Sequence, residues 1–297
     1  MQAVPGGSQA QSHEFTMTSA FTMVNRQGQT IHVYPTRDVF QTFEGVLPGS
    51  GRVTMRHGGG GTNLTYHGGP VQTAPKLYLV LWGSSWSAGG DPDGVASRLQ
   101  SFYGVIGGSR WLNSVSQYTQ NGGAHVGNSG NIFAGTWSDT GSNPPGSPSQ
   151  SNIAAEATRA AAHFGDYSAS ASYVIAMASG IRPSGFGSQY CAWHSSTSTS
   201  GGTIAYTNLP YMPDAGASCG VGSVNSPGTL DGVTIVGGHE QGETETDPQP
   251  NSGWLDGSGN ENGDKCAWTG LENNPNAGGY PTQPLWSNAT SSCVQSY

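Results

Sequence analysis

The chain has 297 residues, a formal net charge of −8, only 9% charged residues and 47 glycines. Its length permits one large domain with a substantial core, and its composition is typical of secreted proteins with many loops. The acidic balance, without a local cluster of Lys and Arg, excludes the surface that nucleic acids require. No apolar run approaches the roughly eighteen residues of a membrane span, and residues 1–20 lack the pattern of a signal peptide. We therefore expect a protein without nucleic-acid partners or a membrane span.

Residues 1–74 are rich in Gly, Gln, Thr and Ser, with short alternating stretches such as Thr30–Tyr34. This composition predicts an extended, partly disordered N-terminal arm. No later linker divides the strand and helix patterns into separate cores. We therefore expect residues 75–297 to form a single catalytic domain.

Two continuous apolar runs, over residues 76–82 and 172–178, predict buried strands. Between them, apolar residues recur at helical spacing from Asp93 to Ile106 and from Ser151 to Phe164, where Ser151 can cap the second helix. This order predicts an α/β (α+β) fold: a loop-rich mixed central sheet with packed helices.

The four cysteines form an early and a late pair, and none of them makes a CxxC motif. Three connectivities remain possible, but proximity in the sequence favours disulfides within each pair over free thiols. Each such bridge would close a loop of about 28 residues and contribute roughly 3–4 kcal/mol. The predicted pairs are Cys191–Cys219 and Cys266–Cys293.

Seven of the eighteen acidic residues fall between Glu240 and Asp264, and such crowding repels itself unless a cation is present. On a short helix, His239 and Glu243 stand four residues apart on one face and can bind one ion, with Glu240 beside its open position. This arrangement resembles the active-site helix of the HExxH zinc peptidases, with Glu243 in place of the second His. We therefore predict a metal-dependent hydrolase in which Glu240 is the general base acting on a metal-bound water.

Zinc accepts a mixed set of His and carboxylate ligands, so it is the expected cofactor. Calcium is the alternative, although it prefers oxygen ligands alone and would gain little from His239. The third ligand must come from outside the helix. Asp264 and Glu261 are slightly favoured because a disulfide at Cys266 would hold their loop, and His194 is the third candidate.

A wider set of motifs surrounds this segment. Leu230–Glu243 contains DGxxxxxxHExxE, Thr246-Asp-Pro248 follows it, and Glu261–Cys266 reads ExxDxC. In these motifs the chain resembles the EXORDIUM or phosphate-induced protein family of plant cell walls and its bacterial relatives. Further matching features are Val80–Gly83 with Trp86, Cys191–His194, and Trp286–Asn288 before Cys293, so the resemblance covers roughly residues 70–297. It implies an extracellular protein but no particular reaction.

Other mechanisms find less support. The many serines have no distinguishable base, four paired cysteines leave no thiol nucleophile, and Glu240 and Glu243 on one helix turn cannot flank a sugar bond from both sides. We therefore expect a secreted zinc metallopeptidase acting on proteins or peptides. The alternative is a non-enzymatic module that binds cell-wall glycan around a structural calcium. In that case sugar rings would stack on Trp82, Trp86, Trp193, Trp254 and Trp286. The remaining His residues, including His32, receive no predicted role.

Overall fold

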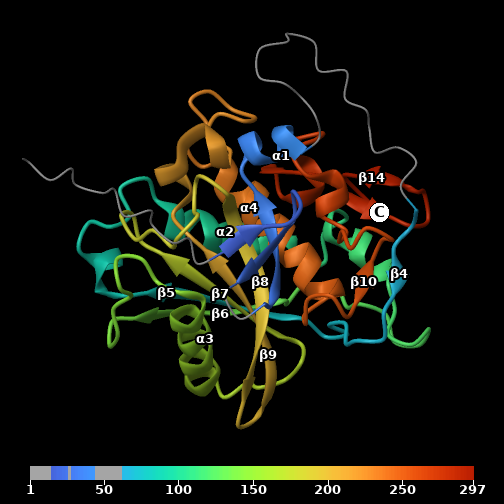
Figure 1. Ribbon diagram of the computed structural model, residues 1–297, viewed down its shortest axis with the longest axis horizontal. Helices are drawn as coiled ribbons and strands as arrows, with labels where there is room; N and C mark the ends of the chain where they lie inside the picture. The colour runs from blue at the N-terminus through green and yellow to red at the C-terminus, as the bar shows by residue number, and fades with distance from the viewer. Residues whose placement is uncertain (1–14, 26–27, 44–61) are drawn as a thin grey trace, which may run out of the picture.

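A computed structural model describes residues 15–25, 28–43 and 62–297 of the chain (Figure 1). Its centre is an eight-stranded mixed sheet of order β1-β2-β3-β8-β9-β7-β5-β6. The strands are β1 (Phe15–Met17), β2 (Thr22–Asn25), β3 (Thr30–Pro35), β5 (Lys76–Trp82), β6 (Phe133–Asp139), β7 (Ala171–Met177), β8 (Tyr190–Thr199) and β9 (Gly202–Leu209). Neighbours from β9 to β6 are parallel, whereas neighbours from β1 to β9 are antiparallel. The expected mixed central sheet is confirmed.

The helices cover both faces of this sheet. They are α1 (Arg37–Phe43), α2 (Val95–Ile106), α3 (Gln150–Phe164) and α4 (Asp231–Thr246). The crossovers β5-α2-β6 and β6-α3-β7 run in opposite directions along the sheet, and right-handed crossovers therefore place α2 and α3 on opposite faces. Helix α4 packs against α2 and against strands β8 and β9, so it lies on the α2 face (Figure 1).

Sequence patterning located several of these elements closely. Strand β5 has the predicted bounds, and Leu79 and Leu81 are buried. Helix α2 begins at Val95, and both carboxylate oxygens of Asp91 accept backbone N–H groups of its first turn. Helix α3 is capped by Ser149 rather than by the predicted Ser151, because Ser149 forms a reciprocal capping box with Asn152.

The prediction of a separate N-terminal arm is wrong for residues 15–25 and 28–43. These residues form three strands of the central sheet and the helix α1, and β3 pairs along β8. Non-local pairing explains the difference, because β3 gains its partner from a strand more than 150 residues later in the sequence. The rest of the predicted arm up to residue 61 lies outside the described residues.

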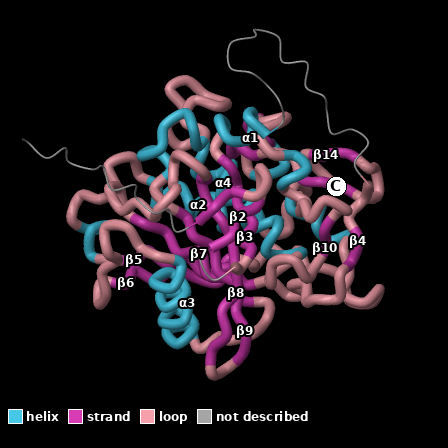
Figure 2. Tube along the Cα trace, viewed as in Figure 1, coloured by secondary structure: helices cyan, strands magenta, loops and turns pink. Residues whose placement is uncertain are grey.

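Much of the remaining chain consists of loops with small two-stranded sheets and short 3-10 helices (Figure 2). The small sheets pair β10 (Trp254–Leu255) with β4 (Thr65–Tyr66), β11 (Glu272–Asn274) with β12 (Tyr280–Thr282), and β13 (Leu285–Ser287) with β14 (Ser292–Val294). The 3-10 helices are Ser84–Ser87, Leu112–Gln117, Met212–Cys219, Asp264–Cys266 and Pro275–Ala277.

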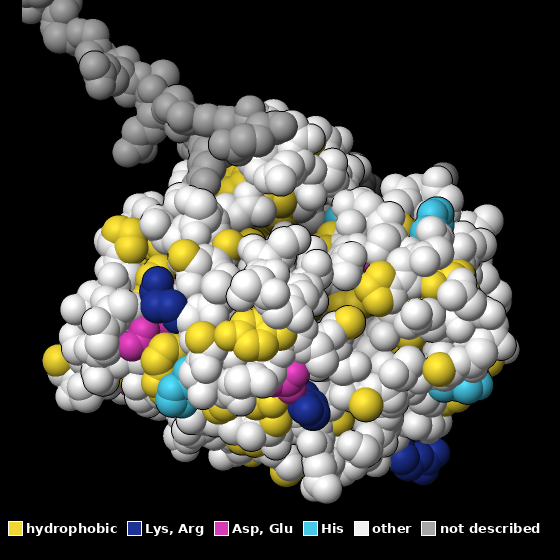
Figure 3. Space-filling view, turned by 90° about the horizontal axis from the view of Figure 1, so that it is seen from below, with side chains coloured by type: hydrophobic (Ala, Val, Ile, Leu, Met, Phe, Trp, Pro, Cys, Tyr) yellow, Lys and Arg dark blue, Asp and Glu magenta, His cyan; other side chains and the backbone are white. Residues whose placement is uncertain are grey.

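Two disulfides, Cys191–Cys219 and Cys266–Cys293, confirm the predicted pairing. Such bridges are compatible with an extracellular protein. Within the part of the chain that the structure describes, no helix has the length and apolar character needed to cross a membrane. On the face seen in Figure 3, charged side chains are few and scattered.

Helix α4 is buried over its whole length, including its polar residues. It is longer than the predicted short helix because the apolar residues from Val233 to Val236 form its first turns. Glycine permits close packing: a Cβ at Gly238 would lie 2.9 Å from the Trp111 ring and 3.1 Å from the Phe102 ring. The aromatic side chains of Trp111 and Phe102 therefore occupy the space that this glycine leaves.

Candidate metal centre

Helix α4 presents the HExxE segment to a buried polar cluster. One helical turn brings His239 Nε2 within 3.0 Å of Glu243 Oε2, as the i, i+4 spacing predicts. Glu240 is turned toward β8, where its Oε2 lies 3.2 Å from His194 Nδ1. All of these side chains are at most 1% exposed. The helix therefore carries its ligand-type groups into the interior of the protein.

The central sheet supplies two more imidazoles. His194 on β8 and His32 on β3 are directly opposed in the antiparallel register, so both side chains point to the same face of the sheet. Tyr34, two residues beyond His32 on that face, packs its ring 4.3 Å from the ring of His239. Strand β3, which belongs to the N-terminal part of the chain, therefore covers one side of the cluster.

The third part of the cluster is the loop before Cys266. Glu243 Oε1 accepts the backbone N–H of Asp264 at 2.9 Å, and Asp264 Oδ2 accepts the backbone N–H of Glu261 at 3.0 Å. The Cys266–Cys293 disulfide holds the end of this loop. These bonds fix both loop carboxylates beside the helix.

The described residues contain three groups whose ligand atoms lie within 4.8 Å of one another. His239, Glu243 and Asp264 form one, His194, Glu240 and Glu243 form the second, and His32, Glu261 and Asp264 form the third. Glu243 and Asp264 each belong to two groups. The cluster could therefore hold a metal ion, and its shared carboxylates link the possible positions.

Unpartnered atoms provide a test of whether an ion fits. Neither ring nitrogen of His239 has a hydrogen-bond partner, and the same is true of Asp264 Oδ1, Glu240 Oε1 and both carboxylate oxygens of Glu261. A buried polar atom without a partner costs roughly 1–3 kcal/mol, more if it is charged. A cation bound by His239 Nε2 and by these carboxylate oxygens would give them a partner and leave only His239 Nδ1 without one, so the donor set fits a metal.

Without a metal ion, protons must offset the negative charge of the cluster, and the pKa shifts of its side chains show how this occurs. Burial raises the pKa of Glu243 well above its usual range, and the charges of Asp264 and Glu261 raise it further. Burial lowers the pKa of His239, which favours its neutral, metal-binding form. A bound cation would reverse the shift of Glu243, because it favours the ionised carboxylate.

Unlike His239, the two histidines of the sheet have raised pKa values. Burial opposes the charge on His194, but Glu261 and Glu240 raise its pKa well above the usual value. For His32, burial is likewise outweighed by Glu261 and Asp264, which raise its pKa to about 9. Burial tends to raise the pKa of Glu261, yet His194 and His32 hold it below its usual range.

Every site residue predicted from the sequence lies in this cluster: His194, His239, Glu240, Glu243, Glu261 and Asp264. His32, to which the sequence pattern assigned no role, also lies in the cluster, because its ring faces Glu261 and Asp264. The alternating run Thr30–Tyr34 identified a strand, but no local pattern revealed its partner. Three other histidines, His67, His125 and His163, are exposed and lie outside the cluster.

Gly263 closes the cluster over the helix. A Cβ at this position would lie 2.6 Å from His239 Nδ1 and 2.8 Å from Glu243 Oε1. Such distances are too short for any side chain, so the backbone itself covers the His239 ring. The loop and α4 are therefore fitted to one another at the candidate ligands.

The cluster is shielded from solvent on all sides. Its seven side chains, His32, His194, His239, Glu240, Glu243, Glu261 and Asp264, are each at most 3% exposed. A substrate could reach Glu240 only if a covering segment moved.

Comparisons of the chain with models of protein families, with curated proteins and with solved structures gave no match. The candidate function therefore depends on the geometry of the site.

Proposed function

We propose that this chain is a secreted zinc-dependent hydrolase, and more specifically a metallopeptidase of the EXORDIUM-like family. The observation that carries the proposal is the convergence of His239, Glu243 and Asp264. Their ligand atoms come from two segments and include a buried imidazole with no hydrogen-bond partner. The DGxxxxxxHExxE and ExxDxC motifs support the family assignment.

One imidazole and two carboxylates form a ligand set that zinc accepts. His239 Nε2 lies 3.0 Å from Glu243 Oε2 and 3.8 Å from Asp264 Oδ1. Two ligands bound to one tetrahedral zinc at about 2.0–2.1 Å are roughly 3.3 Å apart, so small adjustments suffice. Zinc held there would supply Lewis acidity to a water molecule and to a substrate carbonyl.

Glu240 is the proposed general base. Its Oε2 faces His194 Nδ1 at 3.2 Å, and its Oε1 has no partner. The opposite ring nitrogen of His194 lies 3.2 Å from the Asp247 carbonyl oxygen, to which it can donate. His194 therefore orients one oxygen of Glu240 and leaves the other available for a proton.

A second candidate function has its own support. Complete burial of the cluster is typical of a structural ion, and it favours a non-enzymatic module that binds cell-wall glycan around a calcium ion. However, three of the tryptophans proposed to stack on sugar rings are buried and cannot do so, because Trp82, Trp193 and Trp286 are at most 3% exposed. Of the five tryptophans proposed for sugar stacking, only Trp86 and Trp254 are partly exposed. The imidazoles of the cluster also favour zinc over calcium.

The deciding experiment combines metal analysis with a cleavage assay. The purified full-length protein is dialysed, its zinc and calcium are measured by mass spectrometry, and it is incubated with an unstructured protein with and without a chelator. The proposal requires bound zinc and cleavage that the chelator abolishes. Calcium without zinc, or full zinc occupancy without cleavage of a broad peptide library, would favour the glycan-binding module.

A further inference from the structure

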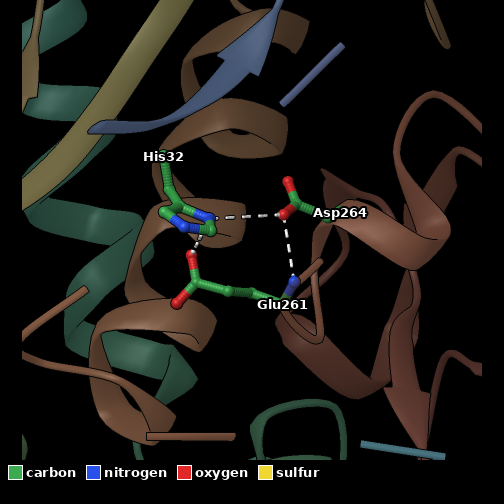
Figure 4. Close-up of side chains that lie close together, drawn as sticks. All are labelled: His32, Glu261 and Asp264. Carbon is green, nitrogen blue, oxygen red and sulfur yellow. Dashed lines mark hydrogen bonds and ion pairs between the residues drawn. The ribbon is translucent and has the colours of Figure 1, made fainter. Parts of the chain in front are cut away.

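Figure 4 shows the group formed by His32, Glu261 and Asp264. This group shares Asp264 with the proposed zinc position but uses its other carboxylate oxygen. His32 Nδ1 is 3.4 Å from Glu261 Oε2 and 3.9 Å from Asp264 Oδ2. All three side chains are at most 3% exposed. His32 Nδ1 and both oxygens of Glu261 have no hydrogen-bond partner.

A hydrogen bond at Nε2, on the other side of the ring, determines the tautomer of His32. Its Nε2 lies 2.7 Å from the amide oxygen of Asn251, which can only accept. Nε2 therefore carries a proton, and a neutral ring then directs the lone pair of Nδ1 toward the two carboxylates. Metal-binding histidines are oriented in this manner, with the second nitrogen donating to a neighbouring acceptor.

The spacing of the atoms is compatible with a shared metal ion and is longer than a direct charge-assisted hydrogen bond. A charged imidazole bonded to a carboxylate would place the two atoms about 2.7–2.9 Å apart. Two ligands of one tetrahedral zinc are instead roughly 3.3 Å apart, given bonds of about 2.0–2.1 Å. The 3.4 Å separation of His32 Nδ1 and Glu261 Oε2 fits the second arrangement.

We infer that His32, Glu261 and Asp264 bind a second divalent transition-metal ion and that the centre is binuclear. Asp264 is the shared ligand, with Oδ1 toward His239 and Oδ2 toward His32. This inference rests on the proposed function in so far as Asp264 also serves the first ion. Zinc suits the combination of imidazole and carboxylates better than calcium or magnesium does.

The second ion would also join two distant parts of the chain. His32 belongs to β3, whereas Glu261 and Asp264 belong to the loop that follows α4. Binding would therefore hold the N-terminal strands against the site, in addition to the pairing of β3 with β8. Loss of the ion should leave β3 in the sheet and remove only this additional attachment.

The test counts metal ions in the full-length protein by mass spectrometry. The protein is dialysed first against buffer with added zinc and then against metal-free buffer. We expect two zinc equivalents per chain in the wild type and in the exposed-histidine control His125→Ala, and one in His32→Ala. One equivalent in the wild type that His32→Ala retains would overturn the second position while leaving the first intact, and one equivalent that His32→Ala loses would overturn the binuclear centre. Two equivalents in His32→Ala would overturn the role of His32. No bound zinc would overturn both proposals.

Asn251→Gly provides a second variant that keeps His32 in place, suits the left-handed backbone at this position (φ 75°) and removes the acceptor for its Nε2. Removing such a partner typically weakens metal binding about 10- to 100-fold. Competition with a chelator of known affinity should show this loss for one zinc equivalent and no change for the other. Equal affinities in the variant and the wild type would contradict the ligand orientation proposed for His32.

Discussion

His32 and His194 face each other across the antiparallel pair of β3 and β8, and His194 lies against Glu240 of α4 whereas His32 lies against Glu261 of the loop that follows α4. This register brings a residue from the N-terminal part of the chain to the candidate metal centre. A shift of one residue would turn His32 to the opposite face of the sheet. The pairing of β3 with β8 therefore decides the composition of the site.

Removal of either helix ligand should release zinc. His239→Ala and Glu243→Ala each delete one of three proposed ligands of the first ion, so each should lose at least one zinc equivalent. Mass spectrometry of the dialysed proteins measures this, with the exposed His125→Ala as the matched control. Unchanged zinc content in both variants would place the ion elsewhere.

Glu240→Gln should separate catalysis from metal binding. Glutamine keeps the shape of the side chain but cannot take a proton, so turnover of an unstructured protein should fall by about 10² to 10⁴ with zinc retained. Zinc content and cleavage rate are measured on the same preparation. If zinc is lost instead, Glu240 is a ligand together with His194 and Glu243, and the assignment as general base fails.

Gly263→Ala should weaken zinc binding without removing a ligand. The new methyl group would lie 2.6 Å from His239 Nδ1 and 2.8 Å from Glu243 Oε1, so the loop must move away from α4. Chelator competition should show a weaker zinc affinity. Gly257→Ala is the control, because the nearest atom to its added methyl group is 3.8 Å away. Equal affinities in the two variants would mean that the loop adjusts without disturbing the ligands.

The two disulfides should contribute differently to the metal centre. Replacing both members of either pair with serine should lower the free energy of unfolding by roughly 3–4 kcal/mol, since each closes a loop of similar length. Only the loss of Cys266–Cys293 should also weaken zinc binding. Asp264 depends on that loop, whereas His194 is held on β8 by strands on both sides. Denaturant unfolding and chelator competition provide the two measurements, and equal loss of zinc affinity in both variants would contradict this view.

Glu156 should make stability depend on pH independently of the metal centre. Burial raises its pKa to about 7, partly offset by the nearby Arg159. The folded state therefore binds more protons than the unfolded state between pH of about 4.5 and 7, and this contribution to stability is lost as pH rises through 7. Relative to the wild type, Glu156→Gln should become more stable by about 1–3 kcal/mol as pH rises from 5 to 8. Denaturant unfolding measures the difference, with exposed Glu272→Gln as the control for loss of a surface charge. A difference that does not change with pH would show that Glu156 titrates normally.

The sequence by itself determined the features that depend on neighbouring residues. The apolar run of β5 and the helical spacing of α2 located those elements, because each pattern follows directly from backbone geometry. The i, i+4 spacing placed His239 and Glu243 together for the same reason. Proximity along the chain was also sufficient to pair the cysteines correctly.

Only the tertiary structure decided which distant residues complete the site. His32 joins Glu261 and Asp264 across more than 200 residues of sequence, through a strand pairing that no local pattern encodes. Tyr34 on the same strand covers His239, so the burial of the centre likewise depends on that pairing. Long-range contacts arise from the packing of the whole sheet, in which the register of one strand fixes the position of every side chain on it.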